Sequence, residues 1–243
     1  MAIAGDNRKS VRNDLKARVL FQNDRLMIID KPAGLPVHAG PRGGPNLEAL
    51  LPQLATHPKH PPMLAHRLDT DTCGCLILAR KRSALRKLHD LFAGGQIGKT
   101  YWAIVEGKPP QASGTIDAHL KKVSDVSGWR MVIDPGGHHA VTGYKILGQT
   151  SALTWLELKP QTGRTHQIRV HCASLGCPVL GDPAYGSAAK DSKIPLHLIA
   201  RRISIPFDEG APPIEAEAPL PEHLRTNFEA CGYKDARDGH KIA

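Results

Sequence analysis

The 243-residue sequence has little of what several protein classes require. Its five cysteines, at positions 73, 75, 172, 177 and 231, include no C-x-x-C pair, so they predict neither a disulfide framework nor a common zinc site. No hydrophobic run approaches the length of a membrane span, and the first residues lack the apolar core of a signal peptide. We find no tandem repeat and no G-x-x-x-x-G-K-[ST] motif. These absences predict a cytoplasmic protein without a membrane segment or nucleotide cofactor.

Acidic residues are scarce relative to basic ones. The chain has 32 Lys and Arg against 23 Asp and Glu, a formal net charge of +9. Such a charge favours a polyanionic partner such as nucleic acid, although it can also serve solubility alone. With 41% hydrophobic residues, the length suits one globular domain with tails. We expect a flexible basic segment at 1–17, a domain at 18–232 and a tail at 233–243.

Hydrophobic periodicity predicts a mixture of strands and helices, and pattern alone goes no further than a mixed α and β class. Short apolar runs bounded by turn residues predict strands at 19–22, 26–29, 75–79, 100–105, 140–147, 152–158 and 196–205. Leucines at helical spacing predict helices that begin at Pro45, Ser83, Thr165 and near Pro221. The polar segment 114–137 is consistent with strands and exposed loops.

The stretch from Leu64 to Arg80, LAHRLDTDTCGCLILAR, is the centre of the functional hypothesis. It places charged residues in a polar turn directly before an apolar run that is typical of a buried strand. A carboxylate held at the edge of a rigid strand, as Asp69 would be, can act as a nucleophile or a general base. The alternative is that Asp69 only caps the turn.

HRLDTDTCG resembles the HRLD-x-x-T-S-G signature of the RluA-type pseudouridine synthases, with Cys73 in place of the family's usual Ser. Three more segments match that family in order and approximate spacing. They are DKPAGLPVHAG, KTYWAIVEG and LKPQTGRTHQIRVHCASLGCPVLGDPAYG. The resemblance covers most of residues 25 to 207. It implies an α+β catalytic fold with a mixed, largely antiparallel sheet, and isomerisation of uridine to pseudouridine in RNA without a metal or other cofactor.

The resemblance also implies roles for particular residues. Asp69 attacks the nucleotide, Tyr101 contacts the base and can assist proton removal, and Arg169 pairs with Asp69. Without the resemblance, Tyr101 would be a core residue and Arg169 a surface arginine. Arg67 fills the space of the extruded uridine, or alternatively pairs with a neighbouring carboxylate. Four further residues are expected near RNA or bracing its loops: His66, Lys31, Arg164 and His166.

Two other functions compete with this hypothesis. The first is an RNA-binding or ribosome-assembly factor that keeps the fold without the chemistry, which the set Asp69, Tyr101 and Arg169 argues against. The second is a metal-dependent hydrolase, suggested by 13 histidines and the pair His138 and His139. Adjacent histidines point apart in a strand, and no H-E-x-x-H motif frames them. We therefore expect a monomeric enzyme acting on ribosomal or transfer RNA, recognised without a separate small RNA-binding module.

Overall fold

The computed structural model describes residues 15–40, 43–57, 59–126, 128–188 and 193–235. The described chain divides into two compact units. Unit 1 takes the described residues up to Lys99 together with Ile199–Pro219, and unit 2 takes Thr100–Leu198 together with the described residues from Leu220 onward. Both units are discontinuous in sequence, so the chain passes from one to the other within β5 (Gly98–Glu106), at the start of β10 (Leu198–Ile205) and after Pro219.

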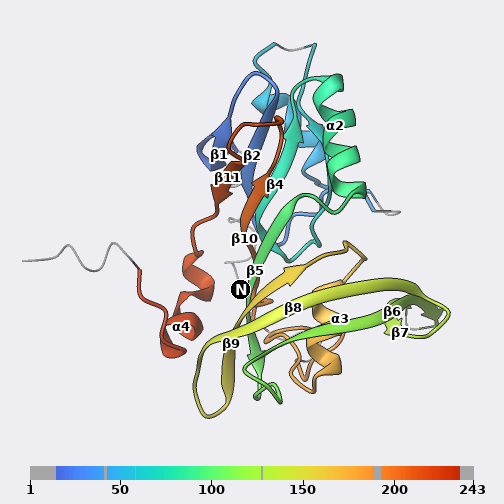
Figure 1. Ribbon diagram of the computed structural model, residues 1–243, viewed down its shortest axis with the longest axis vertical. Coiled ribbons are helices and arrows are strands. Elements are labelled where there is room, and N and C mark those ends of the chain that lie inside the picture. The colour runs from blue at the N-terminus through green and yellow to red at the C-terminus, as the bar shows by residue number, and fades with distance from the viewer. Residues whose placement is uncertain (1–14, 41–42, 58, 127, 189–192, 236–243) are drawn as a thin grey trace, which may run out of the picture. The chain divides into compact units, whose positions relative to one another are not determined.

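The sheet of unit 1 has the strand order β1, β2, β4, β10, with β11 paired to β10 and β3 paired to β4 (Figure 1). Only the pairing of β4 with β10 is parallel. The strand bounds are Val19–Gln22 for β1, Leu26–Lys31 for β2, Met63–Leu64 for β3, Cys73–Ala79 for β4 and Ile214–Glu217 for β11. Every residue of β4 is buried, as expected for a central strand that is covered on both faces.

The helix α2, Arg82–Ala93, packs beside β4 (Figure 1). Its buried residues Ala84, Leu88 and Leu91 recur at helical spacing and form one apolar face. The 3-10 helices η1, Lys16–Arg18, and η2, Glu48–Leu54, complete the regular structure of unit 1. In η2 the Asn46 side chain accepts a hydrogen bond from the Ala49 amide at 3.0 Å, which caps the start of the helix.

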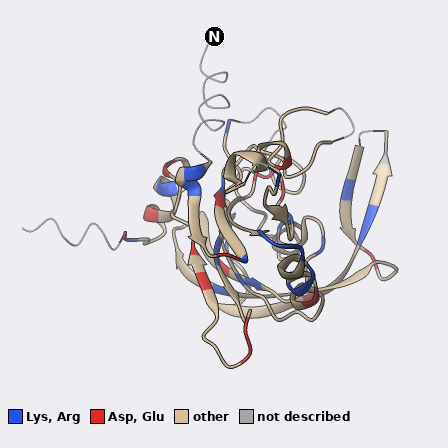
Figure 2. Cartoon of the chain, turned by 90° about the horizontal axis from the view of Figure 1, so that it is seen from above, with Lys and Arg blue, Asp and Glu red and all other residues tan. Residues whose placement is uncertain are grey.

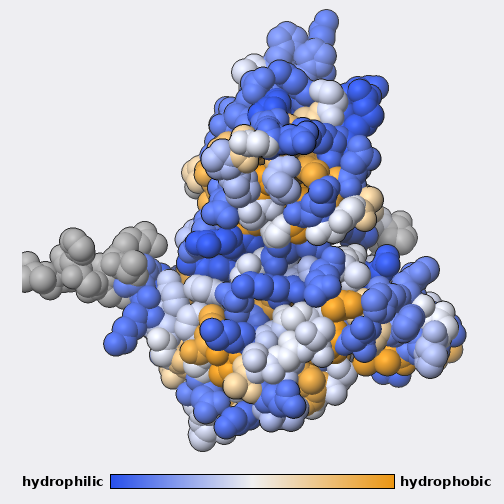
Figure 3. All heavy atoms as spheres, viewed as in Figure 1, coloured by the Kyte–Doolittle hydropathy of each residue, from blue (hydrophilic) through white to orange (hydrophobic). Residues whose placement is uncertain are grey.

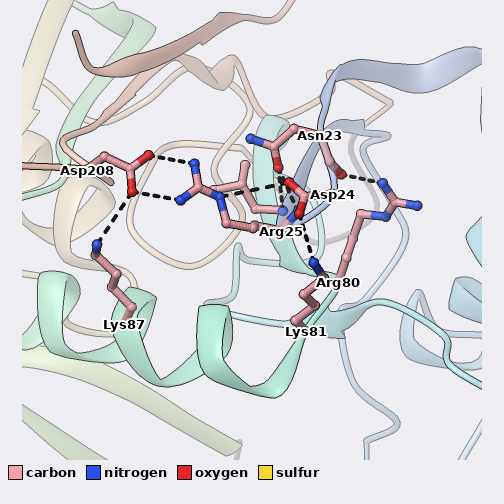
Figure 4. A network of polar contacts seen from close by, with 8 residues as sticks. Asn23, Asp24, Arg25, Arg80, Lys81, Lys87 and Asp208 are labelled. Atoms are coloured by element: carbon pink, nitrogen blue, oxygen red, sulfur yellow. Dashed lines mark hydrogen bonds and ion pairs between the residues drawn. The ribbon is translucent and has the colours of Figure 1, made fainter. Parts of the chain in front are cut away.

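A surface network links the β1–β2 turn to α2 and to the segment after β10 (Figure 4). Arg25 binds both carboxylate oxygens of Asp208, at 2.7 and 2.5 Å, and the Lys87 ammonium lies 3.7 Å from the same carboxylate. Lys81 binds Asp24 at 2.8 Å. Because these groups are exposed, the network fixes geometry more than it adds stability.

The sheet of unit 2 is antiparallel throughout, with the strand order β5, β9, β8, β6, β7. The bounds are Ser113–Asp125 for β6, Gly128–Ile133 for β7, His138–Gln149 for β8 and Leu153–Pro160 for β9. A bulge between Ile146 and Gly148 interrupts the pairing of β8 with β9. A side chain at Gly148 would place its Cβ 1.8 Å from the carbonyl oxygen of Cys231, so only glycine fits there.

Two helices cover unit 2. The helix α3, Gln167–Ser174, lies against β6, β7 and β8 (Figure 1). The helix α4, Glu222–Ala230, buries Leu224 and Phe228 completely. The Phe228 ring joins an aromatic cluster whose other members are Trp102, Trp155 and Tyr233. No helix among the described residues is both long enough and apolar enough to cross a membrane.

Most of the predicted strands are present, and the mixed, largely antiparallel sheets agree with the expected α+β class. Several boundaries were wrong. The helix expected from Pro45 is 3-10, with Pro52 inside it, and α2 begins at Arg82 with Lys81 rather than Ser83 at the N-cap position. The predicted segments 1–17 and 233–243 lie largely outside the described residues. Of their described parts, Leu15 is buried and Tyr233 packs in the aromatic cluster.

Candidate active site

The turn that carries Asp69 is held between two buried residues. Leu68 and Thr72 have only 6% and 2% of their surface exposed, whereas Asp69 is half-buried. The Thr72 amide donates to the Asp69 carbonyl oxygen at 3.2 Å, which closes the turn directly before β4. The Asp69 carboxylate is therefore carried by a short turn whose flanks are fixed in the core of unit 1.

Lys31, the last residue of β2, holds this turn from the other side. Its side chain is fully buried, and Nζ donates to three backbone carbonyl oxygens. These belong to Pro32 at 2.9 Å, Leu35 at 2.8 Å and Thr70 at 2.9 Å. An ammonium group has three N–H donors, so the three carbonyls satisfy all of them. The Gly34 amide also donates to the Thr70 carbonyl, at 2.9 Å, so one oxygen joins the K-P-A-G loop to the Asp69 turn.

Burial lowers the pKa of Lys31 to about 8, while the charges of nearby groups, Asp69 and Asp71 among them, act in the opposite direction. Below that pH the ammonium form prevails and keeps all three hydrogen bonds. Lys31 was expected to lie near RNA or to brace a loop. Its side chain is fully buried and binds loop carbonyls, which favours the bracing role.

Cys73 and Gly74 explain how β4 begins so close to the turn. Burial raises the pKa of the Cys73 thiol to about 12, so this residue behaves as a small apolar side chain where the related signature has Ser. Gly74 has φ +105, and a Cβ there would lie 2.3 Å from the carbonyl oxygen of Ala200. Only glycine allows β10 to pair with β4 directly behind the Asp69 turn.

His66 ties the turn to β4 and α2. Its Nε2 atom accepts a hydrogen bond from the Ile77 amide at 2.8 Å, and its ring lies 4.8 Å from that of Phe92. Burial lowers the pKa of His66 to about 3, and the charge of Lys99 acts in the same direction. His66 is therefore a neutral ring held by the protein, and this structural role differs from the RNA contact expected from the sequence.

Arg67, two residues before Asp69, is exposed. No carboxylate of the described chain forms an ion pair with its guanidinium group, although many other arginines of the protein have such partners. The alternative in which Arg67 merely pairs with a neighbouring carboxylate therefore finds no support among the described residues. Its role in replacing an extruded base stays a prediction.

Tyr101 lies in β5 of unit 2, opposite Leu158 of β9. Its ring is half-buried and packs against a core cluster that includes Ala103 and Val105, which share its face of the strand. Trp102, on the other face, packs against Trp155 with ring centroids 4.8 Å apart. The packing fixes the Tyr101 ring on a rigid strand, and contact with the target base stays a prediction.

Arg169 is buried in α3, so the alternative of a surface arginine was wrong. Its Nε and Nη2 atoms donate to the two oxygens of Asp182, at 2.8 and 2.7 Å, in a bidentate ion pair. Asp182 is fully buried and also accepts hydrogen bonds from the amides of Ala184 and Tyr185, at 2.9 and 3.1 Å. The Arg169 guanidinium lies 5.1 Å from the centre of the Tyr185 ring. The pairing of Arg169 with Asp69 stays a prediction.

The loop before α3 carries Arg164 and His166. Arg164 is exposed, and its Nε donates to the His139 carbonyl oxygen at 3.1 Å. His166, rather than Thr165, occupies the N-cap position and has a left-handed backbone with φ 53. Its Nδ1 atom lies 2.8 Å from the Tyr185 hydroxyl group, and its ring stacks on Trp129 with centroids 5.1 Å apart. Both residues are accessible enough to meet RNA, which stays a prediction.

Sequence reasoning missed three residues of this region, namely Asp182, Tyr185 and Trp129. The first two lie in the motif GDPAYG, which was part of the matching segments but received no role. Its Asp and Tyr were the available signal, because a buried arginine needs a carboxylate partner. Trp129 lies in the segment whose details the sequence pattern did not predict, and nothing there distinguished it.

The histidines that suggested a metal-dependent hydrolase do not form a metal-binding cluster among the described residues. His139 binds Asp117 at 2.7 Å and lies beside the His119 ring, with centroids 5.3 Å apart. Within the described ranges there is no group of three or more His, Cys, Asp or Glu side chains arranged to hold a metal ion. The pair His138 and His139 therefore finds no further metal ligands in that part of the chain.

A family profile described as RNA pseudouridylate synthase matches residues 25–174. An uncharacterised RNA pseudouridine synthase of Zymomonas mobilis is 47% identical over 210 residues, which cover 86% of this chain and 95% of that protein. Ribosomal large subunit pseudouridine synthase D of Xanthomonas campestris pv. campestris is 35% identical, with 92% of this chain and 72% of that protein covered.

A solved structure gives the same result. Human RNA pseudouridylate synthase domain containing 4 superposes with a TM-score of 0.77 at 29% sequence identity. The match covers 92% of this chain and 96% of the human chain. Similarity therefore extends through both units and over the segments that carry the candidate residues.

Proposed function

Because the chain belongs to the RNA pseudouridylate synthase family and isomerises uridine to pseudouridine in RNA, we propose that Asp69 is its nucleophile and that its substrate is a structured ribosomal or transfer RNA. The reaction breaks the bond between uracil N1 and ribose C1′ and forms a bond between uracil C5 and the same C1′. The proton on C5 is lost and N1 gains one, so the product is an isomer. No redox step is involved.

The observation that carries the assignment of Asp69 is the way its turn is held. The turn is closed by the Thr72 amide, flanked by buried residues and tied through Thr70 to the buried ammonium group of Lys31. A nucleophile on such a turn keeps its orientation without a reorganisation cost during the reaction. The nucleophile can attack either uracil C6 or ribose C1′. Both reactions require an accessible carboxylate on a rigid support.

Tyr101 and Arg169 complete the proposed set. Tyr101 would contact the uracil ring and assist removal of the C5 proton, and its rigid position on β5 supports this role. Arg169 would pair with the Asp69 carboxylate and hold it in position, because a guanidinium group binds a carboxylate in a fixed geometry. The bidentate pair with Asp182 supports a fixed guanidinium rather than a mobile one. These roles rest on the resemblance and are tested by substitution.

A uridine inside a helix cannot reach a carboxylate on a protein turn. The enzyme must extrude it, at a cost of a few kcal/mol of unstacking, roughly. Arg67 is our candidate to occupy the vacated space, because a planar guanidinium group stacks well on bases. Its exposure, and the lack of a carboxylate partner in the described chain, support this role.

Support for the class of RNA comes from composition and from relatives. A net charge of +9 favours contacts to phosphates. Two matching proteins are named ribosomal large subunit pseudouridine synthase, C of Haemophilus ducreyi and D of Xanthomonas campestris pv. campestris. We propose ribosomal RNA as the first candidate and transfer RNA as the second.

The test is to map pseudouridines in total RNA from cells that lack the protein, after incubation with the purified wild type or with Asp69→Asn. The wild type should restore pseudouridine at specific positions, and Asp69→Asn should restore none while still binding the same RNA. The matched control is Asp71→Asn, which removes an exposed carboxylate from the same turn and should stay active. Asp69→Asn turnover within about tenfold of wild type would remove Asp69 as the nucleophile, because a lost nucleophile costs several orders of magnitude.

The same experiment tests the remaining alternative, an RNA-binding or ribosome-assembly factor that has no pseudouridine synthase activity. Such a factor would bind RNA but form no pseudouridine with either the wild type or a variant. Asp69→Asn would then be indistinguishable from wild type in every measurement.

A further inference from the structure

The hairpin of β6 and β7 presents an exposed tryptophan. Trp129 has 47% of its surface exposed, whereas Trp155 has 8% and Trp102 is half-buried. Ile133 and Val126 of the same hairpin are also exposed, and hydrophobic surface is visible among hydrophilic residues at this end of unit 2 (Figure 3). A large aromatic side chain left in water contributes little to the core, so its position needs another explanation.

The strand register places Trp129 on the face of the hairpin that also carries its buried residues. Lys122 of β6 pairs with Met131 of β7, so these two side chains share one face of the hairpin. Leu120 and Trp129, each two residues away in its own strand, lie on that same face. Leu120 and Met131 are buried in a small core with Val170 of α3. Trp129 and Lys122 therefore continue a packed face beyond the point where the core ends.

The Trp129 ring packs on His166, which is itself held in place by Tyr185. Its ring stacks on His166 with an interplanar angle of 27°. The Tyr185 hydroxyl group accepts a hydrogen bond from the Met131 amide at 3.0 Å, and it lies within hydrogen-bond distance, 2.8 Å, of Nδ1 of His166. The Tyr185 ring packs under the Arg169 guanidinium. The stack is therefore connected through one ring to the buried pair of Arg169 and Asp182.

A positive charge lies beside the exposed ring. The Lys122 ammonium lies 4.8 Å from the centre of the Trp129 ring. Arg130, the next residue along the strand, is on the opposite face of the hairpin. Figure 2 shows Lys and Arg on both strands of the hairpin. Among the side chains that the structure describes, no carboxylate forms an ion pair with Lys122. An exposed aromatic ring beside such a cation is the combination that single-stranded nucleic acid uses for stacking and phosphate contact.

We propose that Trp129, supported by His166, is a stacking platform for an unpaired base of the substrate RNA, and that Lys122 holds an adjoining phosphate. The inference rests on the proposed function in taking RNA as the ligand, and it adds a binding site to the reacting residues. Lys122 has a flexible stem, so its ammonium can move from the ring to a phosphate when a base stacks. A platform of this kind accepts any base, because every base has a π-face.

The direct test uses the intrinsic fluorescence of the full-length protein. Titration with a single-stranded RNA of about 16 nucleotides, the upper end of common site sizes, should quench the fluorescence as a base stacks on the exposed indole. An abasic oligonucleotide with the same backbone should bind through phosphates and quench little. In Trp129→Phe the RNA-dependent quench should disappear although the RNA still binds, because Trp102 and Trp155 lie within packed aromatic contacts.

Affinity provides the second measurement. Trp129→Ala should weaken binding of the RNA about tenfold, in the range reported for loss of one base–aromatic stack, and Trp129→Phe should recover most of it. The matched control is Ile133→Ala, which removes a side chain of similar exposure, 49%, from the same strand. Lys122→Gln should lower the slope of log affinity against log salt by about one.

Two results would overturn the platform. One is a quench in Trp129→Phe as large as in wild type, and the other is a Trp129→Ala variant that binds RNA as tightly as Ile133→Ala. Neither measurement depends on turnover. A wild type that forms pseudouridine but shows no Trp129-dependent quench would leave the proposed function standing without the platform. A wild type that forms no pseudouridine but shows the Trp129-dependent quench would support the platform and contradict the proposed function.

Discussion

The two units bury a positive charge in different ways. In unit 1 the ammonium group of Lys31 faces three backbone carbonyl oxygens, which are neutral dipoles. In unit 2 the guanidinium group of Arg169 faces the carboxylate of Asp182, which is an opposite charge. Both cations are satisfied in hydrogen bonds, but only the second is also balanced in charge.

The difference teaches what each cation is suited to do. Dipoles compensate a buried charge incompletely, so the pKa of Lys31 falls to about 8. This cation can join two loops that are distant in the chain. A bidentate pair fixes both position and angle of one guanidinium group. In unit 1 Lys31 therefore holds a turn together, whereas in unit 2 Arg169 is a guanidinium group of fixed position and orientation. The first three of the five predictions below test this contrast.

The largest effect is expected from breaking the charge balance in unit 2. Asp182→Asn keeps the size of the side chain but removes the buried negative charge of the bidentate pair with Arg169. We expect the free energy of unfolding, from urea titration, to fall by about 3–5 kcal/mol. Asp117→Asn, which removes an exposed carboxylate from the same unit, is the control and should change it little.

Arg169→Lys tests the same comparison, because lysine keeps the positive charge but lacks the planar guanidinium group that makes two parallel hydrogen bonds. Pseudouridine formation should fall much further than in Arg202→Lys, whose arginine shares an exposed carboxylate in unit 1. Full activity of Arg169→Lys would mean that charge alone is sufficient in unit 2. The contrast between the two units would then be lost.

Lys31→Met should have the next largest effect. Methionine fills the space but removes one donor from each of three carbonyl oxygens, of which only that of Thr70 keeps the Gly34 amide as a second donor. We therefore expect the free energy of unfolding to fall by about 2–4 kcal/mol. Turnover should fall while RNA affinity is kept, since the turn that carries Asp69 loses its brace. Lys81→Met, which removes an exposed lysine that binds Asp24, is the matched control. An unchanged turnover number in Lys31→Met would show that Asp69 does not need the K-P-A-G loop.

A buried histidine gives each unit a pH-dependent stability. His171 of unit 2 is fully buried, and burial lowers its pKa to about 4 from the usual 6.5. The unfolded chain then binds more protons than the fold between these two values, so the stability present above pH 6.5 is lost as the pH falls toward 4. The loss is about 3 kcal/mol by linkage.

His171→Gln should flatten the curve of unfolding free energy against pH in that window, whereas His138→Gln, at an exposed position, should leave the curve unchanged. A wild-type curve that is already flat between pH 6.5 and 4 would contradict the shift. His66 in unit 1, with its pKa lowered to about 3, has the same sign.

The smallest and most selective effect is expected at Arg67. If Arg67 replaces the extruded uridine, Arg67→Ala should slow modification of a structured stem-loop about tenfold more than that of a short unstructured RNA with the same target. The measurement is the ratio of single-turnover rates at saturating enzyme, so that weaker binding cannot imitate the effect. Arg86→Ala removes another exposed arginine of unit 1 and is the control. Equal losses on both RNAs would leave Arg67 as a support for the turn.

Sequence patterns predicted the central part of unit 1 because its signals are local. The apolar run before Ala79 is buried on both faces, and the turn residues before it mark the strand's start. The strands at 19–22 and 26–29 and the helix that begins near Pro221 followed from spacing in the same way. The residues that bear the proposed chemistry were found through the resemblance rather than through periodicity.

The misses have a common physical origin in contacts between distant segments. The carbonyls around Lys31 come from separate loops, so a residue that looked suited to RNA is in fact buried. The carboxylate partner of Arg169 lies beyond the end of its helix, where helical spacing makes no prediction. At η2 the prediction failed for a local reason, because Pro52 interrupts α-helical hydrogen bonding.

The parallel pairing of Gly74 with Ala200 also sets an order of events while the chain is being made. The strand that backs the Asp69 turn is translated only after the whole segment 100–198 of unit 2. At about 5–20 residues per second, roughly ten seconds separate the two strands. During that interval β4 has its partner β2 but not β10. Until β10 has been translated, the nascent chain therefore carries Asp69 on a sheet that lacks one of its strands.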